Sequence, residues 1–195
     1  SAYSVGQYNW TFTYSGDDIY ENSEAKATAN ILIIPTEIIA NTTSSLFVDD
    51  TAQITYNLTP DDAVGNIKFT SNDTSVVEVD QDGNIKAIGE GKAIITVTFE
   101  DSKNYTASST NVTLTVSKIA TEITLTNVTI ELKAYQSIGD LAVLFPSEAG
   151  NLTYVSNNED IVLVSDGGII YARKNGTATV TVSFAGDDKY KAAES

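Results

Sequence analysis

The chain has 195 residues, a net charge of −15 and 42% hydrophobic residues, and it contains no Cys, His or Met. Without Cys or His it cannot form a disulfide, a zinc site of the usual kind or a Ser-His-Asp triad. The negative charge opposes binding to nucleic acid, which needs a basic surface, and no apolar run reaches the roughly 18 residues that cross a bilayer. These features predict a non-enzymatic protein that binds no nucleic acid and inserts into no membrane.

An 85-residue repeat organises the whole chain. The phrase "YSGDDIY" returns as "FEDSKNY" and "FAGDDKY", so that Tyr20, Tyr105 and Tyr190 follow one another at a single fixed spacing. The copies align along the sequence without an insertion or a deletion. We therefore predict that every copy builds the same object from the same length of chain, with the three tyrosines closing one edge of each core.

The first element, residues 1–34, corresponds to only the last two strands of a preceding unit. A lone hairpin with an aromatic face is not stable in water, so we expect this orphan hairpin to be covered by neighbouring repeats or by another copy of the chain. Its alternation places Trp10 in a core. The face that would be covered consists of Tyr8, Trp10, Phe12, Tyr14, Ala27, Ala29 and Ile31.

Residues 35–118 are expected to form one complete domain of about seven short strands. Apolar residues alternate through Val97, with Ile94 as the exception, and again through Leu114. A period of two with β-branched enrichment is typical of half-buried strands. "DQDG" at 80–83 predicts a hairpin connection. The stretch "AQITYNL" predicts an inward row formed by Ala52, Ile54, Tyr56 and Leu58. The fold class is therefore all-β, in tandem antiparallel β-sandwiches with an 85-residue period.

Residues 119–195 repeat this domain but lack its final strand, the one that matches 111–118. One explanation is that the chain was cut from a longer array whose other repeats order the incomplete ends. The alternative is strand exchange, in which "EAKATANILI" of one molecule fills the final position in another, as in donor-strand complementation. Repeated head to tail, that exchange would build a filament.

Two aromatic residues break the repeat within 119–195. Tyr135 and Phe145 align by the 85-residue spacing with Asp50 and Pro60. They are candidates for a binding surface, and the competing interpretation, which we favour, is that they repack the core of a diverged copy.

The segment "FTSNDTSVVEVDQDGNIKAIGEGKAIITVTF" resembles the bacterial and archaeal Ig-like repeats of invasin- and intimin-type surface proteins. With "YSGDDIYENSEAKATANI", the chain is similar to adhesin-like proteins of methanogenic archaea. The resemblance implies Ig-like sandwiches in a non-catalytic stalk or scaffold segment of a cell-surface adhesin or extracellular filament. The alternative is a carbohydrate- or protein-binding adhesion module. The implied partners are neighbouring repeats or copies of the chain, and surface glycans or proteins of host or microbial cells.

Nine Asn-X-Ser/Thr sequons occur, several times what the composition gives by chance, and they predict an extracellular glycoprotein. Asn57 and Asn111 fall on the outward side of their strands, where a glycan would be tolerated. Asn-rich turns beside Thr-rich strands would also generate sequons without selection for sugar. The candidate sites are Asn9, Asn41, Asn57, Asn72, Asn104, Asn111, Asn127, Asn151 and Asn175.

No cofactor is predicted, although Ca²⁺ at the domain junctions is an alternative because hard cations prefer carboxylate oxygens. Lys103 in the middle copy of the phrase weakens any repeated metal site. The carboxylates concerned are Asp17/Asp18 or Asp187/Asp188 with Asp49/Asp50 or Asp61/Asp62. A self-formed isopeptide bond would need a buried lysine, and we do not expect one. The lysines at outward or junction positions are Lys68, Lys86, Lys92, Lys118 and Lys133.

Overall fold

The computed structural model describes residues 5–127, 129–139 and 141–195. Within these ranges almost all regular structure is β-strand, and the one helical element is the short 3₁₀ helix η1 (Ser147–Ala149). The described residues contain no helix whose length and hydropathy would let it span a bilayer. The chain divides into two compact units, Ser1–Ser44 with Thr51–Lys86 and Lys92–Leu114, and Ser45–Asp50 with Ala87–Gly91 and Thr115–Ser195.

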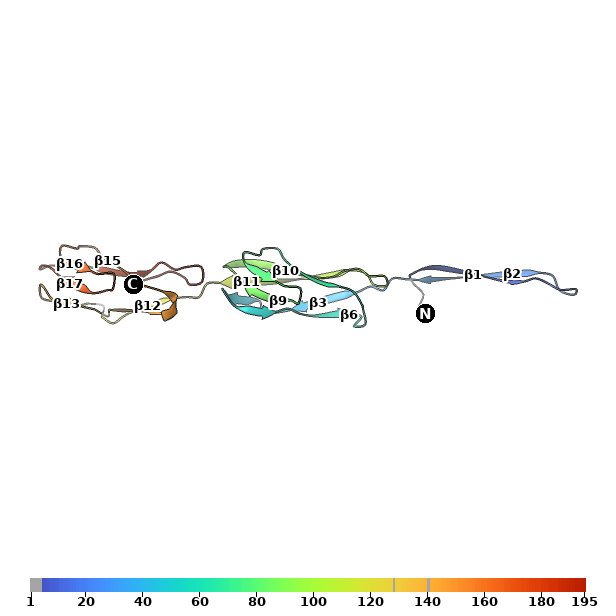
Figure 1. Ribbon diagram of the computed structural model, residues 1–195, viewed down its shortest axis with the longest axis horizontal. Helices are drawn as coiled ribbons and strands as arrows, with labels where there is room; N and C mark the ends of the chain where they lie inside the picture. The colour runs from blue at the N-terminus through green and yellow to red at the C-terminus, as the bar shows by residue number, and fades with distance from the viewer. Residues whose placement is uncertain (1–4, 128, 140) are drawn as a thin grey trace. The chain divides into compact units, whose positions relative to one another are not determined.

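The N-terminal hairpin is a two-stranded antiparallel sheet of β1 (Gly6–Tyr14) and β2 (Ser23–Ile31) (Figure 1). Its register places Trp10 opposite Ala27, so the aromatic row lies beside a row of alanines on one face. The other face is polar, and there Thr28 donates a hydrogen bond of 2.7 Å to the Asn9 side chain.

The aromatic face of the hairpin is open to solvent. Trp10, Phe12 and Tyr14 are 40%, 62% and 45% exposed. The equivalent residues of the next copy, Ile95, Val97 and Phe99, are all 0% exposed. The same strand is therefore a core strand in the middle repeat and a surface strand in the hairpin, and the prediction that Trp10 lies in a core is wrong.

The middle repeat is built from two sets of strands. The first consists of the two-stranded sheet β3-β6 and the three-stranded sheet β5-β9-β8, which are consecutive along the chain because only Ile54 separates β5 from β6. The second is the sheet β4-β11-β10-β7, in which β4 and β11 run parallel. The strands are β3 (Glu37–Asn41), β4 (Ser45–Phe47), β5 (Thr51–Gln53), β6 (Thr55–Thr59), β7 (Ile67–Ser71), β8 (Val77–Val79), β9 (Asn84–Ala87), β10 (Gly91–Phe99) and β11 (Ser108–Ser117).

The buried positions of the middle repeat follow the predicted alternation. Val97 and Leu114 are both 0% exposed, and the predicted connection at 80–83 is a turn in which Gly83 has φ 80° and donates to Asp80 O. One position differs from the prediction, because Tyr56 is 43% exposed. Its ring lies beside the buried Phe69 at a centroid distance of 6.1 Å, at the margin of the core.

The third repeat has the same strand order with shorter strands. One set runs β12-β14 and β13-β17-β16, and the other runs β15-β18-β19. Residues 131–133, which correspond to β4, form no strand, and β19 is very short. The strands are β12 (Glu122–Leu125), β13 (Ser137–Ile138), β14 (Ala142–Phe145), β15 (Thr153–Ser156), β16 (Val162–Val164), β17 (Ile170–Ala172), β18 (Val180–Phe184) and β19 (Ala193–Glu194).

The turn before the second strand of the third repeat is displaced by one position from where the period would place it. Asp49 and Tyr135 both have a left-handed backbone, with φ 74° and 68°. Asp49 N donates to Ala87 O and Tyr135 N donates to Ala172 O, and these two acceptors do match by the period. The side chain that follows each donor, from Asp50 or Gln136, accepts a 2.8 Å hydrogen bond from a backbone N–H earlier in the same turn.

The displacement persists through the second strand and then disappears. Ile38 pairs with Leu58 in the middle repeat, and Ile123 pairs with Leu144 in the third. Ala63 N donates to Pro60 O, and Ala149 N donates to Pro146 O. These two equivalent turns are still one position further apart than the 85-residue period. Gly65 and Gly150 again match by the period, and each lies against the equivalent phenylalanine ring. The prediction of a gapless repeat is therefore wrong. The third repeat gains one residue between Thr126 and Lys133 and has no counterpart of Val64.

Candidate functional site

The repeated phrase forms a loop that holds the linker entering its own repeat. Ile34 N donates to Asn104 O at 2.8 Å, and Thr106 N donates to Ile34 O at 2.9 Å. The backbone of Ile34 thereby forms a parallel bridge with Tyr105. We call the segments 16–21, 101–106 and 186–191 the docking loops.

The third repeat holds its linker in the same way. Ile119 N donates to Lys189 O and Lys191 N donates to Ile119 O, both at 2.8 Å, and Ile119 bridges to Tyr190. A threonine just after the bridge adds a side-chain contact in each repeat, because the Oγ1 atoms of Thr36 and Thr121 each donate at 2.7 Å to a carbonyl of their docking loop. This role was not predicted, although the recurrence of the threonine in "PTEI" and "ATEI" is its signal in the sequence.

An Asx turn gives the docking loop its shape. Asp187 Oδ1 accepts hydrogen bonds from Lys189 N and Tyr190 N at 2.8 and 2.7 Å. These backbone donors, helped by the nearby lysines, hold the pKa of the Asp187 carboxyl below its ordinary value. Asp17 forms the same turn, and the hydrogen bond from Tyr14 Oη is the largest cause of its lowered pKa.

The three tyrosines of the repeated phrase differ in burial. Tyr190 is 7% exposed and Tyr105 is half-buried, but Tyr20 is 65% exposed. The prediction that each tyrosine closes a core edge is confirmed for Tyr190 and is wrong for Tyr20. The loop that carries Tyr20 has the same backbone turn as the loop of Tyr190, since Asp17 N donates to Tyr20 O at 2.9 Å. Within the described part of the chain, however, the linker bridge is seen at Tyr105 and Tyr190 alone.

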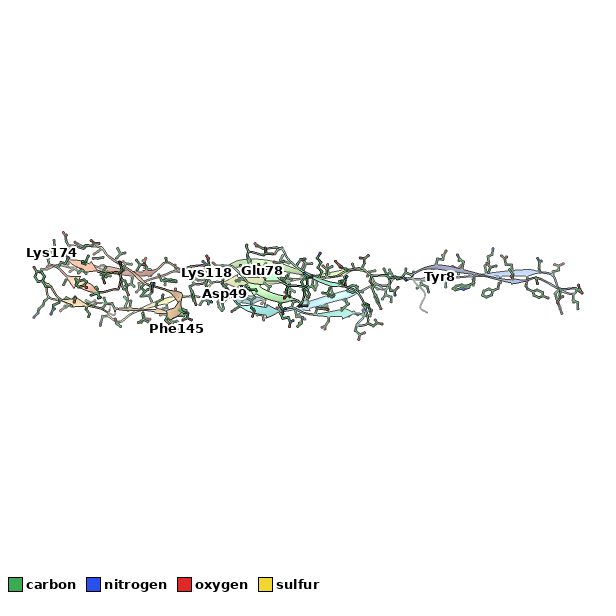
Figure 2. The ribbon with its side chains drawn as sticks, viewed as in Figure 1. Tyr8, Asp49, Glu78, Lys118, Phe145 and Lys174 are labelled. Carbon is green, nitrogen blue, oxygen red and sulfur yellow. The ribbon has the colours of Figure 1, made fainter. Side chains whose placement is uncertain are left out.

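A lysine pairs with the carboxylate that was a candidate calcium ligand. Within the second compact unit, Lys189 Nζ lies 3.0 Å from Asp49 Oδ2, and this hydrogen bond and the negative charge raise the pKa of Lys189. Lys118 Nζ donates to Asp187 O. Asp49 and Lys118 are labelled in Figure 2. The described residues contain no group of three or more acidic side chains placed to hold a metal ion.

The other predicted positions are placed as follows. All nine sequon asparagines are exposed, and Asn72 and Asn111 use their side-chain oxygens to accept hydrogen bonds from Ile94 N and Thr96 Oγ1. The seven residues of the strand-exchange face lie together on the hairpin, with Tyr8 and Ala29 half-buried and the others exposed. Among the described residues no charged side chain is buried, so none of the lysines considered for an isopeptide bond lies in a core.

Two aromatic residues of the third repeat lie outside its core. Tyr135 is 92% exposed and Phe145, on β14, is 70% exposed (Figure 2). The favoured expectation of core repacking is wrong for both. For Phe145 the displacement by one position explains this, because its counterpart is the outward-facing Thr59 and not Pro60. Tyr135 lies in a turn, at the position of the exposed Asp49. Phe145 now stands opposite Glu122, on the outward side of β12 and β14.

Three curated proteins resemble the chain. An uncharacterized protein of Clostridium acetobutylicum is 29% identical over 164 residues, which are 82% of this chain and 17% of that protein. An alpha-L-arabinofuranosidase of Bifidobacterium longum is 33% identical over 51% of this chain and 9% of its own length. A lacto-N-biosidase of Bifidobacterium bifidum is 38% identical over 41% of this chain and 7% of its own length. The chain thus spans less than a fifth of each relative.

Two solved structures illustrate the similarity in three dimensions. An intimin mutant of EHEC O157:H7 aligns over 51% of this chain and 52% of its own, with 14% identity and a TM-score of 0.31. The S-layer protein rSbsC(31-844) aligns over 97% of this chain and 34% of its own, with 13% identity and a TM-score of 0.40. The family model of the bacterial Ig-like domain (group 2) matches residues 35–109. Together with the all-strand fold, this match shows that the middle repeat belongs to the bacterial Ig-like domain family.

Proposed function

We propose that the chain is a non-catalytic stalk or scaffold segment of an extracellular surface protein. The observation that carries this proposal is the hydrogen-bonded linker. Ile34 and Ile119 are each fixed to the docking loop of the repeat that they enter. A linker held on both its N–H and its C=O leaves a shorter free segment between two repeats, and a spacer needs short joints. The wholly apolar core, with no charged side chain buried among the described residues, fits a structural role.

Amide hydrogen exchange tests the scaffold role. The amides of Ile34, Thr106, Ile119 and Lys191 should exchange slowly, as strand amides do, because each is a donor across the linker bridge. Exposed loop amides of the same chain provide the internal reference. Exchange of all four at the rate of an unstructured chain would leave the repeats joined by free hinges and would defeat the proposal.

The extracellular location is supported by the exposure of all nine sequon asparagines. Secretion from a host that attaches N-glycans is expected to give glycoforms by intact-mass measurement, and Asn→Gln changes should remove them one site at a time. Asn57, opposite Ile39 on the outward side of β3 and β6, is the first site to test. An unmodified mass after secretion would argue against the glycoprotein assignment.

Strand exchange is the assembly mode that we propose for this scaffold, with β2 of one copy taking the final-strand position of another copy's third repeat. It is supported by two open surfaces. The aromatic face of the hairpin is exposed, and β18 is less buried than β10, with Val180 half-buried where Ile95 is 0% exposed. Residues 131–133, which would lie next to the incoming strand, are not yet a strand.

Trp10, the only tryptophan, reports directly on this exchange. Its emission and its iodide quenching should change as the protein concentration rises, because β1 must separate from β2, whose Ala27 lies opposite Trp10 in the hairpin, before β2 can enter another sheet. Ala27→Pro, which removes a β2 donor and prevents extension of the strand, should abolish the change. Emission and quenching of Trp10 that stay the same at every concentration would exclude exchange.

A carbohydrate- or protein-binding adhesion module is the second candidate. It is favoured by the neighbouring side chains of Val143 and Phe145 on β14, which are 59% and 70% exposed. An exposed aromatic ring with an apolar neighbour offers a stacking surface for a sugar or a peptide. Isothermal titration with a panel of surface oligosaccharides should then give heat that Phe145→Ala abolishes. Heat that survives this change, or no heat from any of the sugars, would argue against this site.

A further inference from the structure

The contact between Lys189 and Asp49 is a template for how a docking loop meets the end of a preceding repeat. The loop supplies Lys189, and the end of the middle repeat supplies Asp49 from the turn after β4. Both residues belong to the second compact unit. A surface hollow beside this pair is lined by Glu90, Lys118 and Lys191, so charges of both signs surround the contact. Equivalent positions in the other copies can be compared with this template residue by residue.

The docking loop of the hairpin presents a different residue at the lysine position. Ile19 stands in the first copy of the phrase where Lys189 stands in the last, and it is 83% exposed. Tyr20 beside it is 65% exposed. The loop backbone is held in the same Asx turn, since Asp17 Oδ1 accepts from Ile19 N at 2.8 Å. An isoleucine is therefore displayed on an ordered loop where the template has a cation.

The end of the third repeat presents a different residue at the aspartate position. Tyr135 takes the place of Asp49, is 92% exposed and has φ 68°. A tyrosine in the left-handed region is uncommon and carries a conformational cost. Exposing a large ring at such a position gives the isolated repeat no benefit, which indicates that another surface covers it. The apolar Ile19 is the residue that the template would place against this ring.

The charges around the two positions differ from the template in a complementary way. The hairpin loop carries Asp17, Asp18 and Glu21 and no basic residue, whereas the third-repeat loop carries Asp187 and Asp188 with Lys189 and Lys191, so its formal charges cancel. The end of the third repeat carries Lys133, Arg173 and Lys174, whereas the end of the middle repeat carries Asp49, Asp50 and Glu90. Tyr135 N donates to Ala172 O, so the backbone of Tyr135 is bonded to the residue that immediately precedes Arg173 and Lys174. Lys174 is labelled in Figure 2.

We propose that the docking loop 16–21 of one molecule binds the end of the third repeat of a second copy, with Ile19 against Tyr135. In this arrangement Asp18 and Glu21 face Lys133 and Lys174, although Lys174 already pairs with Asp160 at 3.2 Å. The absence of lysines from the hairpin loop also gives specificity, because this acidic loop is repelled by the acidic end of a middle repeat. This contact deepens the proposed scaffold role and does not require strand exchange.

Sedimentation velocity over a range of protein concentrations tests the contact, in a buffer of about 0.15 M salt. At that ionic strength a Debye length of about 8 Å screens the long-range repulsion between the acidic molecules, while close charge pairs persist. The full chain is expected to self-associate. Tyr135→Asp and Ile19→Lys should each weaken the association about tenfold or more. Both remove the apolar contact. The first also places a negative charge opposite the acidic loop, and the second places a positive charge opposite the basic end of the third repeat.

The double variant provides the decisive measurement. Ile19→Lys combined with Tyr135→Asp recreates the pair formed by Lys189 and Asp49, so the association should recover to within about threefold of the original. Val64→Asp is the matched control, because Val64 is 78% exposed and belongs to neither surface, and it should leave the association unchanged.

Three outcomes would overturn the proposal: a monomer at all concentrations, equal weakening by the control, or a double variant no stronger than the single ones. A shift in Trp10 emission that persists in Tyr135→Asp would show strand exchange without this contact, so the two proposals fail separately.

Discussion

Asp49 and Tyr135 occupy the same structural position in consecutive repeats, although their separation exceeds the 85-residue period by one position. Both donate their backbone N–H to an equivalent alanine carbonyl, and both have a left-handed backbone. The insertion that causes this displacement is compensated before Gly150, so the overall period is restored. One consequence is that Asp49 of the middle repeat, which pairs with Lys189, is replaced in the third repeat by the exposed ring of Tyr135.

Leu114→Ala is expected to destabilise the middle repeat by about 2–5 kcal/mol, because it opens a cavity at a side chain that is 0% exposed. The loss should appear as a lower urea midpoint with an unchanged slope. Leu163→Ala, at a side chain that is 38% exposed in the third repeat, is the matched control and should cost much less. Similar losses in the two variants would contradict the burial assigned to Leu114.

Gly65→Ala is expected to destabilise the middle repeat by about 1–3 kcal/mol through overpacking. A Cβ at this position would lie 2.5 Å from Phe99 Cε2, and that ring is fully buried. Gly167→Ala is the control, since its Cβ would have only Ser165 Oγ nearby, at 3.9 Å. Thermal melts of the two variants compare them directly, and a neutral Gly65→Ala would mean that the ring can move aside.

Thr121→Val is expected to lose about 1 kcal/mol, since it removes the hydrogen bond from Oγ1 to Lys191 O while keeping the shape of the side chain. The effect should be local, and hydrogen exchange should speed up at the Ile119 and Lys191 amides. Thr124→Val on the outward side of β12 is the control. Unchanged protection at both amides in Thr121→Val would show that the backbone bridge alone fixes the linker.

The free energy of unfolding is expected to fall as the pH drops below about 4. Asp17, Asp73, Asp80 and Asp187 each have a pKa lowered mainly by hydrogen bonds to their carboxylates. A lowered pKa in the folded state contributes stability above the ordinary aspartate value of about 3.9, and that contribution is lost as the pH falls through the folded value. Between pH 7 and 5, protonation of a few carboxylates lowers the net negative charge, and the weaker repulsion among the remaining charges raises the free energy of unfolding.

Thermal melts at pH 7, 5, 4 and 3 measure this dependence. Asp80→Asn should flatten the acid limb, because the Asp80 carboxylate accepts from both the backbone and the side chain of Asn84. Asp18→Asn, which changes the same net charge at an exposed loop position, is the control. Stability that rose steadily down to pH 3 would contradict the assigned carboxylate hydrogen bonds.

Removal of Ca²⁺ with EDTA is expected to leave the melting temperature unchanged. Lys189 is the cation paired with Asp49, at 3.0 Å, and a second positive charge at that carboxylate would be repelled. The matched variant Lys189→Gln should lower the melting temperature slightly, as expected for an exposed ion pair. Stabilisation of the original chain by millimolar Ca²⁺ would instead support a metal at this junction.

The sequence predicts the strands well where one alternating pattern decides them. Ile95, Val97 and Phe99 alternate and are buried, because a period of two determines which side chains share a face. The same alternation in Trp10 and Phe12 does not determine burial, since a face becomes a core only when a second sheet covers it. No local pattern carries that information.

The remaining errors have similar causes. Phe145 is exposed because it takes the outward position of Thr59. The sequence does not show this, because the gain of one position and the later loss of another cancel along the chain, and only the strand pairing with Glu122 reveals the displacement. Tyr20 was expected at a core edge because the phrase is repeated. The burial of Tyr190, however, accompanies a linker bridge to Ile119, which is a contact between segments far apart in the sequence.

The parallel pairing of β4 with β11 has a consequence for a protein under tension. β4 follows the entry to the middle repeat and β11 leads out of it, with Val116 level with Leu46. Pulling on the two ends of this repeat draws the parallel strands in opposite directions along their lengths. Their hydrogen bonds are then loaded in shear and must break together, which makes the repeat slow to give way, and forced unfolding is governed by that rate.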